Sequence, residues 1–246
     1  MYYCNNKIKV TYNKVALTTT GAYKYGILLQ NCIATDSTKG IVANNFSSVL
    51  NGGTYAYGIR LYTCTNFDVV FNSAITNGTS TTDTRALNIT SACTLIKLFN
   101  NNLQSNRYPF HIEANASITA SDNNNIYATG TAFAIWNGSP YANLAALKTA
   151  SLKDSNSVSI DPMFISNTDL HILTTLLAQK GRPIAGIVDD IDGTLRNTTA
   201  PAIGAHEVQL IANDAGVTYI AQPGAVETEG STLPVKVAIM KMPAHC

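Results

Sequence analysis

The sequence predicts an all-β protein built as a solenoid, in which short strands and turns stack coil upon coil. Three observations predict it. The first four cysteines, Cys4, Cys32, Cys64 and Cys93, are 28, 32 and 29 residues apart, and similar sequence surrounds the later ones. The chain contains 25 Asn with abundant Ser and Thr, which favour turns, between short runs of Ile, Val, Leu and Phe. These runs alternate over a few residues and lack the 3.6-residue apolar period of a helix.

The cysteine spacing reflects a repeat that is used about four times. The stretches before Cys32, Cys64, Cys93 and Ala116 read YGILLQN, YGIRLYT, ALNITSA and PFHIEAN. Each is followed by apolar or small residues and then by an Asn-rich corner. One coil cannot bury its apolar side alone, whereas coils stacked at the ~4.8 Å strand spacing pair their backbones and form a continuous core. Asn at the corners tolerates left-handed backbone and can hydrogen-bond to the Asn of the next coil.

The repeat predicts that Cys32, Cys64 and Cys93 form an interior column of small apolar thiols. Disulfides remain the alternative, although neighbours stacked on parallel strands rarely have disulfide geometry. The sequence has no C-x-x-C pair and no His at metal-ligand spacing, so we expect no zinc site and no metal.

With these coils, the chain resembles the right-handed parallel β-helix proteins of the pectate-lyase-like superfamily over residues 1–207. Residues 141–164 are similar to a segment near the end of such proteins, in which a short helix on an insertion, here residues 141–153, leads to an Asp-x-Asn-Ser turn and Asp-Pro-x-Phe. Residues 169–173 are similar to the strand that follows. The matching positions of the turn segment are Asp154, Asn156, Ser157, Asp161, Pro162 and Phe164.

Residues 189–207 are similar to the terminal segment of that family. The matching positions are Asp190, Asp192, Gly193, Arg196, Pro201, Ile203, Gly204, Ala205 and Glu207. Ala202 stands where Asp is usual, and His206 where an aromatic residue is usual. A calcium loop that begins at Asp190 would need Glu at its twelfth position, which is Pro201. We therefore expect a structural closing coil, with 201–205 as a final strand over the open core edge and Arg196 paired with Asp or with Glu207.

The character of the sequence changes after Glu207. Residues 213–241, with Val235, Val237 and Ile239 in alternation, resemble the first strands of an immunoglobulin-like module, but too few residues remain for a complete sandwich. We expect a β-helix at 1–207 whose N-terminal coils are missing, and at 208–246 a linker with a truncated module. The resemblance implies a piece of a larger, monomeric, exported bacterial protein.

Aligned repeats indicate which polar side chains share the outer surface. Arg60 and His111 fall in one predicted column, and Tyr62 and Glu113 in the next. If the apolar residues between them face inward, all four face outward, and Tyr62 could stack on a sugar. We take these four as candidate glycan-binding residues, with an ordinary solvated sheet face as the alternative. The aligned sets are Leu28, Arg60, Asn88 and His111, then Gln30, Tyr62, Thr90 and Glu113.

Two functions of different class remain open at this point. The first is a non-catalytic extracellular or cell-surface protein with a structural or adhesive role. The second is a polysaccharide lyase or glycoside hydrolase whose catalytic residues lie partly outside these coils. Hydrolysis needs two carboxyl groups, and only Glu113 lies on the columns. Uronate elimination needs a base such as Arg60 beside a Ca²⁺ held by carboxylates, so Ca²⁺ is implied only by this second function.

Composition excludes two further classes of partner. The net charge is +1 and only 13% of residues are charged, which does not favour nucleic acid or anionic lipid. The sequence contains no stretch of ~18 consecutive apolar residues, so it predicts no membrane-spanning helix. The candidate surface around Arg60 and Tyr62, together with the family resemblance, implies a polysaccharide or a cell-surface glycan as the partner.

Overall fold

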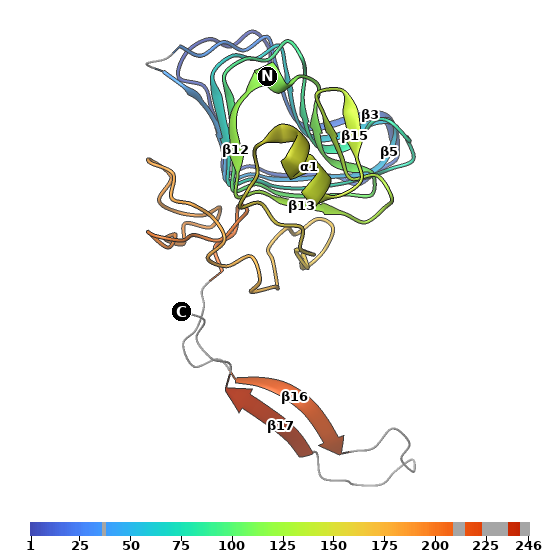
Figure 1. Cartoon of the computed structure of the whole chain (residues 1–246), viewed down its shortest axis with the longest axis vertical. Helices are drawn as coiled ribbons and strands as arrows, with labels where there is room; N and C mark the ends of the chain where they lie inside the picture. The colour runs from blue at the N-terminus through green and yellow to red at the C-terminus, as the bar shows by residue number, and fades with distance from the viewer. Residues whose placement is uncertain (36–37, 209–214, 223–235, 242–246) are drawn as a thin grey trace. The chain divides into compact units, whose positions relative to one another are not determined.

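Parallel strands from successive coils build three faces around one core. The computed structural model describes residues 1–35, 38–208, 215–222 and 236–241, and the chain divides into two units, Met1–Val208 and Gln209–Cys246. The first unit is a parallel β-solenoid of about four turns, which confirms the predicted all-β solenoid (Figure 1).

Each face takes one strand from each coil. The first face consists of β1 (Lys9–Thr11), β4 (Gly40–Ala43), β6 (Phe67–Val70), β9 (Ile96–Phe99) and β12 (Ile118–Asp122). The second face consists of β2 (Lys14–Leu17), the first half of β5 (Phe46–Tyr62), β7 (Ser73–Gly78), β10 (Asn102–Ser105) and β13 (Asn125–Ala128). The third face consists of β3 (Gly21–Gln30), the second half of β5, β8 (Thr84–Ile89), β11 (Tyr108–Ile112) and β14 (Ala134–Trp136).

The core is made of like residues in register. On the third face, a column of four apolar side chains is completely buried, and equivalent columns from the other faces meet it. Burial of each such side chain contributes roughly 1.5–3 kcal/mol. The column is Leu29, Leu61, Ile89 and Ile112.

Buried asparagines form a ladder at the corner between the first and second faces. Each side-chain Nδ2 donates to Oδ1 of the Asn in the next coil, with distances of 2.8, 3.0 and 3.1 Å between Asn45, Asn72, Asn101 and Asn124. The residue before each of these has a positive φ, and three of those four residues are Asn. The ladder therefore satisfies buried polar groups at a corner that must adopt left-handed backbone.

A short helix covers the last coil. After β14 the chain returns in antiparallel β15 (Ser139–Tyr141), and α1 (Leu144–Ser151) lies within the predicted 141–153 insertion. Asn143 caps α1 by accepting a hydrogen bond from Ala146 N at 2.9 Å. Leu147 is completely buried in the core, and Figure 1 shows α1 drawn over the interior of the coils, between β12 and β15. The remaining short element is a 3₁₀ turn, η1 (Asn115–Ser117).

Residues 164–207, which we call the strap, run beside the coils (Figure 1). Side-chain amides from the left-handed corners hold it. Asn44, Asn100 and Asn123 each donate through Nδ2 to a strap carbonyl oxygen, at 2.9, 2.7 and 2.9 Å. The strap also covers outward apolar side chains of the second face, because Leu170, Ile191 and Ala205 pack on Phe46 and Ile75.

The position of the strap corrects one expectation. Residues 201–205 do not form a strand and do not cover the open end of the core. They lie against the side of the coils, where the amide nitrogen of Ala205 donates to Ser73 Oγ at 3.0 Å and that of Gly204 to the carbonyl oxygen of Asn100 at 2.8 Å. The physical reason is that Phe46 and Ile75 on the second face need apolar cover, while α1 already covers the end of the core.

The second unit contains an antiparallel pair, β16 (Ala215–Gln222) and β17 (Lys236–Lys241). Two strands do not identify a sandwich, so the immunoglobulin-like module stays a prediction. Val235 and the rest of 223–235, with 209–214 and 242–246, lie outside the described residues. The part of the chain that is described contains no helix with the length and hydropathy of a membrane span.

Candidate functional site

The third face places the predicted columns next to each other. Arg60 pairs in register with Leu28 on one side and Asn88 on the other, Asn88 pairs with His111, and Gln30 pairs with Tyr62. The alternate residues are buried in the core, so the intervening side chains lie on the outer surface. The buried set is Ile27, Ile59, Leu87 and Phe110.

The outer columns are not uniformly open to solvent. Tyr62 is 41% exposed and Arg60 is partly buried, whereas Asn88 is 0% and His111 only 8% exposed. Asn88 Nδ2 lies 3.2 Å from His111 Nδ1, and the ring of Tyr108 meets the imidazole edge to face at 6.0 Å. The surface is thus closed around His111 and open around Arg60, a difference that strand alternation alone does not predict.

Arg60 lies among tyrosine rings. Its guanidinium carbon is 4.6 Å from the ring centroid of Tyr57, 5.2 Å from that of Tyr62 and 5.9 Å from that of Tyr25. Such distances allow cation–π attraction. Arg60 Nε is buried without a hydrogen-bond partner, and no ion pair among the described residues includes Arg60.

These groups surround a shallow hollow of about 260 Å³ on the first two coils. Three tyrosines, an arginine and a glutamine amide line it, so it offers flat apolar surfaces together with hydrogen-bonding groups. We call this the Arg60 hollow. Its lining residues are Tyr2, Tyr25, Leu28, Gln30, Arg60 and Tyr62.

The prediction did not include several residues around Arg60 and Tyr57, among them Tyr25, Tyr57, Arg85 and Asp83. Tyr57 pairs in register with Tyr25 and with Arg85, so Tyr25, Tyr57 and Arg85 belong to one further column. The repeated Tyr-Gly-Ile at 25–27 and 57–59 carried the signal for the tyrosines. Nothing in the repeat pointed to Asp83, because it lies in the loop before β8 and reaches this surface through side-chain contacts.

The carboxylates of Asp83 and Glu113 both form ion pairs with Arg85. Its guanidinium lies 2.9 Å from Asp83 and 3.7 Å from Glu113. Burial acts to raise the pKa of Asp83, but hydrogen bonds from Thr82 and Tyr57 and the charge of Arg85 lower it below its usual value. Asp83 is therefore held ionised, the opposite of the state that a general acid requires.

His111 is held neutral. Burial, together with the nearby charge of Arg85, lowers the pKa of His111 to about 3. Burial likewise raises the pKa of Tyr57, whose hydroxyl is hydrogen-bonded to Asp83. These groups therefore keep one protonation state near pH 7.

The predicted cysteine column lies inside the solenoid. Cys32, Cys64 and Cys93 are 0, 0 and 1% exposed, and all have free thiols, as does the partly buried Cys4. Cys64 N donates to Cys93 Sγ at 3.3 Å. The column packs in the core beside the apolar residues.

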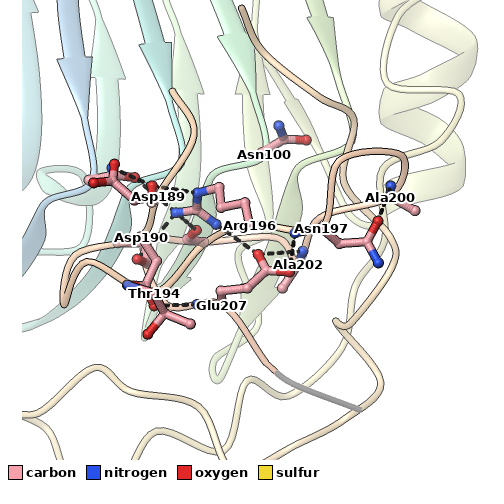
Figure 2. Close-up of polar contacts among 12 residues, drawn as sticks. Asn100, Asp189, Asp190, Thr194, Arg196, Asn197, Ala200, Ala202 and Glu207 are labelled. Carbon is pink, nitrogen blue, oxygen red and sulfur yellow. Dashed lines mark hydrogen bonds and ion pairs between the residues drawn. The ribbon is translucent and has the colours of Figure 1, made fainter. Parts of the chain in front are cut away.

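Arg196 organises the predicted closing segment (Figure 2). It is 6% exposed, and its guanidinium carbon lies 3.9 Å from the ring centroid of Phe71. Its NH1 donates to Glu207 Oε2 at 3.1 Å, so the predicted pair with Glu207 forms. The other acceptors are Asp189 O at 3.0 Å, Asn44 Oδ1 at 2.8 Å, Gly204 O at 3.1 Å and Ala205 O at 3.2 Å.

The remaining residues of this segment shape the turns. Asp190 is completely buried, and its carboxylate accepts hydrogen bonds from the backbone nitrogens of Asp192, Thr194 and Glu207 at 2.9, 2.8 and 2.9 Å. Gly193 supplies a positive φ of 83° in the turn between them. Because backbone N–H groups occupy the carboxylate oxygens of Asp190, this residue serves as a turn cap.

Gly204 and Asp192 have different surroundings. Gly204 has a φ of 105°, and a Cβ there would lie 2.9 Å from Ser73 Oγ, so the strap approaches β7 more closely than a side chain permits. Asp192 faces outward and accepts from Lys14 Nζ at 2.7 Å and lies 2.6 Å from His171 Nε2. Both residues therefore fix the strap to the coils.

Comparisons of the chain with protein-family models, with curated proteins and with solved structures find no match.

Proposed function

We propose that the protein is a non-catalytic β-solenoid whose third face binds glycan, in a structural or adhesive role. The observation that carries this proposal is the Arg60 guanidinium, which lies among three tyrosine rings, lines the hollow and makes no ion pair among the described residues. Ligand sites combine apolar walls with a few placed polar groups, and the Arg60 hollow has both.

The chemistry of the hollow suits a sugar. Tyrosine rings offer a flat apolar surface for the C–H face of a pyranose, with a hydroxyl at the edge. The guanidinium offers several N–H donors in one plane to sugar oxygens, and the amide of Gln30 can donate and accept. Tyr62, which is 41% exposed, is the ring that β5 contributes to this hollow.

The arrangement of charged side chains supports binding over catalysis. A glycoside hydrolase would need a protonated carboxyl group opposite a second carboxylate, whereas Asp83 is ionised and shares Arg85 with Glu113. A uronate lyase would need carboxylates beside Arg60 for a cation. Among the described residues, no group of three His, Cys, Asp or Glu side chains is placed to hold one.

We further propose an extracellular or bacterial cell-surface location, within a larger multidomain chain and as a monomer. This rests on the similarity of residues 1–207 to the pectate-lyase-like superfamily and of 213–241 to an immunoglobulin-like module. The even charge balance supports a glycan partner over nucleic acid.

A glycan array tests the proposal. The full chain is applied to immobilised bacterial, plant and animal polysaccharides, together with Tyr62→Ala, Arg60→Gln and the control Tyr3→Ala, which removes a 74% exposed tyrosine outside the hollow. We expect retention on at least one glycan by the wild type and the control, and its loss in the other two variants. Equal retention by all four proteins would contradict the proposal.

The same glycans test the enzymatic alternative. Uronate polymers are incubated with the protein and Ca²⁺, and the absorbance of new unsaturated ends is followed. A calcium-dependent increase would replace the non-catalytic function with a lyase.

A further inference from the structure

A second hollow opens on the same strands, at the other end of the third face. Its volume is about 480 Å³, and it lies where β5 bends between the second and third faces. Tyr55, Gly53 and the loop at 79–83 line it. The loop offers hydroxyl groups, since Thr79, Ser80, Thr81 and Thr82 follow one another. We call this the corner hollow.

A row of tyrosines connects the two hollows. The ring centroids of Tyr23 and Tyr55 are 5.3 Å apart, those of Tyr55 and Tyr57 are 5.7 Å apart and stacked, and those of Tyr57 and Tyr25 are 5.4 Å apart. Arg60 continues the row at 4.6 Å from Tyr57. Aromatic and cationic groups are thus in contact from one hollow to the other.

The row has a defined direction and a rigid base. It follows β3 and β5, and from Tyr55 to Tyr62 it spans up to ~23 Å at the usual ~3.3 Å per strand residue. Tyr57, in its middle, is only 2% exposed and is hydrogen-bonded to Asp83. The buried ring of Tyr57 therefore supports the accessible rings and does not need to rearrange when a ligand binds.

The direction from coil to coil offers no comparable path. The next residues in register after Arg60 are Asn88 and His111, which are buried and hydrogen-bonded to each other. A chain that crossed them would find no exposed aromatic surface in that column. Along the strands, in contrast, Tyr23 and Tyr62 are exposed and Tyr25 and Tyr55 are partly exposed, with the buried Tyr57 between them.

The charge of the corner hollow indicates the kind of sugar. Its one charged residue is Asp83, which Arg85 and Tyr57 already engage. Neutral hydroxyl and backbone groups make up most of the rest of the lining. They match sugar hydroxyls as donors and acceptors, and the lining contains no Lys or Arg to pair with a carboxylate.

We infer that the third face binds a linear oligosaccharide along β3 and β5, with one subsite in the Arg60 hollow and a second subsite, for an uncharged sugar, in the corner hollow. This inference rests on the proposed glycan-binding function. It adds that the ligand is extended, lies along the strands and occupies two subsites.

Calorimetric titration of the full chain tests this inference. The probes are cello-oligosaccharides, xylo-oligosaccharides and oligogalacturonides, each as disaccharide and as hexasaccharide. We expect at least one of the two uncharged hexasaccharides to bind more tightly than its disaccharide, whereas such a gain for the oligogalacturonide alone would contradict an uncharged sugar in the corner hollow. Tyr55→Ala and the 66% exposed Tyr23→Ala should weaken that hexasaccharide roughly three- to tenfold and leave the disaccharide unchanged. Tyr62→Ala should weaken both, and Tyr3→Ala neither.

The outcomes separate the two proposals. Equal affinity for disaccharide and hexasaccharide, or no effect of Tyr23→Ala and Tyr55→Ala, overturns the two-subsite inference and leaves glycan binding standing. Absence of binding to every hexasaccharide also overturns the inference. If the glycan array is blank as well, the proposed function fails with it. Urea unfolding of Tyr55→Ala distinguishes lost contact from lost folding, and Tyr23→Ala, being exposed, provides the independent variant.

Discussion

Two arginines on the solenoid have opposite surroundings. Arg196 in the strap is 6% exposed and donates to five oxygen atoms, one of them from the Glu207 carboxylate. Arg60 on the third face is partly buried among tyrosine rings, and its Nε has no partner. Both stack on aromatic rings, so the stacking does not distinguish them.

The difference lies in hydrogen bonding. A buried guanidinium with all its donors engaged holds the protein together, because removing it leaves several acceptors without partners. A guanidinium that lines a hollow and makes no ion pair among the described residues can donate to a ligand. We therefore assign Arg196 to stability and Arg60 to binding, and the variants below are ordered by the expected size of their effect on stability.

Replacement of Arg196 should have the largest effect. Arg196→Met leaves the Glu207 carboxylate buried without its cation, and we expect a loss of about 3–5 kcal/mol in the free energy of unfolding. Urea unfolding, followed by circular dichroism, measures it. The double variant Arg196→Met, Glu207→Leu should recover part of the loss, since no unpaired charge remains. A loss under about 1 kcal/mol in the single variant would contradict the structural role.

Asp190 should rank second. Asp190→Asn retains one acceptor oxygen but presents an NH₂ group to a backbone N–H that the second carboxylate oxygen had accepted. We expect a loss of about 1–3 kcal/mol, again from urea unfolding. Asp161→Asn is a matched control, because Asp161 is exposed and its carboxylate accepts from Met163 N in a surface turn. Equal effects of the two variants would show that burial of Asp190 does not matter.

The strap should also respond to pH through His171. Burial acts to lower the pKa of His171, but Asp192 and Asp169, which contact its two ring nitrogens, raise it above the ordinary ~6.5. This stabilisation is present below about pH 6.5 and is lost as pH rises through the folded-state pKa. We expect less than about 1 kcal/mol, because solvent screens the partly exposed carboxylates.

The contribution of the Asp169 and Asp192 carboxylates to stability depends on pH in the opposite sense. Burial acts to raise the pKa of Asp169 and Asp192, yet hydrogen bonds with His171, and with Lys14 for Asp192, lower it. Their contribution is lost only as pH falls below about 4. The lowered pKa values of His111 and His206 act in the opposite sense over this range, so the effect of His171 is read as a difference between two proteins. The stability advantage of the wild type over His171→Gln should shrink from about pH 6 to pH 8, and a constant difference would refute the assignment to His171.

Arg60 should have the smallest effect on stability. Arg60→Gln removes cation–π contacts worth about 0.5–1 kcal/mol and no ion pair among the described residues. We expect its unfolding free energy to remain within about 1 kcal/mol of the wild type. Arg60→Lys should preserve the charge but lose the planar donors, and so weaken binding without affecting stability. A loss of unfolding free energy as large as that of Arg196→Met would show that Arg60 has a structural role.

The sequence was informative where the repeat is regular. The register of Arg60, Asn88 and His111 follows from spacing, because parallel coils place equivalent residues side by side. The Asn ladder follows from the recurring corner for the same reason.

The repeat did not predict contacts between segments that are far apart in the chain. The closure of the surface over His111 depends on Tyr108 packing against the imidazole. The path of the strap depends on Phe46 and Ile75 facing outward and on corner Asn side chains that reach its carbonyl oxygens. Neither has a local pattern, so neither could be predicted from spacing.

The most direct test of the account measures glycan retention of Arg60→Gln and Arg196→Gln on the same array, at a temperature where both remain folded. The account predicts that Arg60→Gln loses retention with an unchanged urea midpoint, while Arg196→Gln keeps retention with a lowered midpoint. Full retention by Arg60→Gln on every glycan that the wild type binds would contradict it.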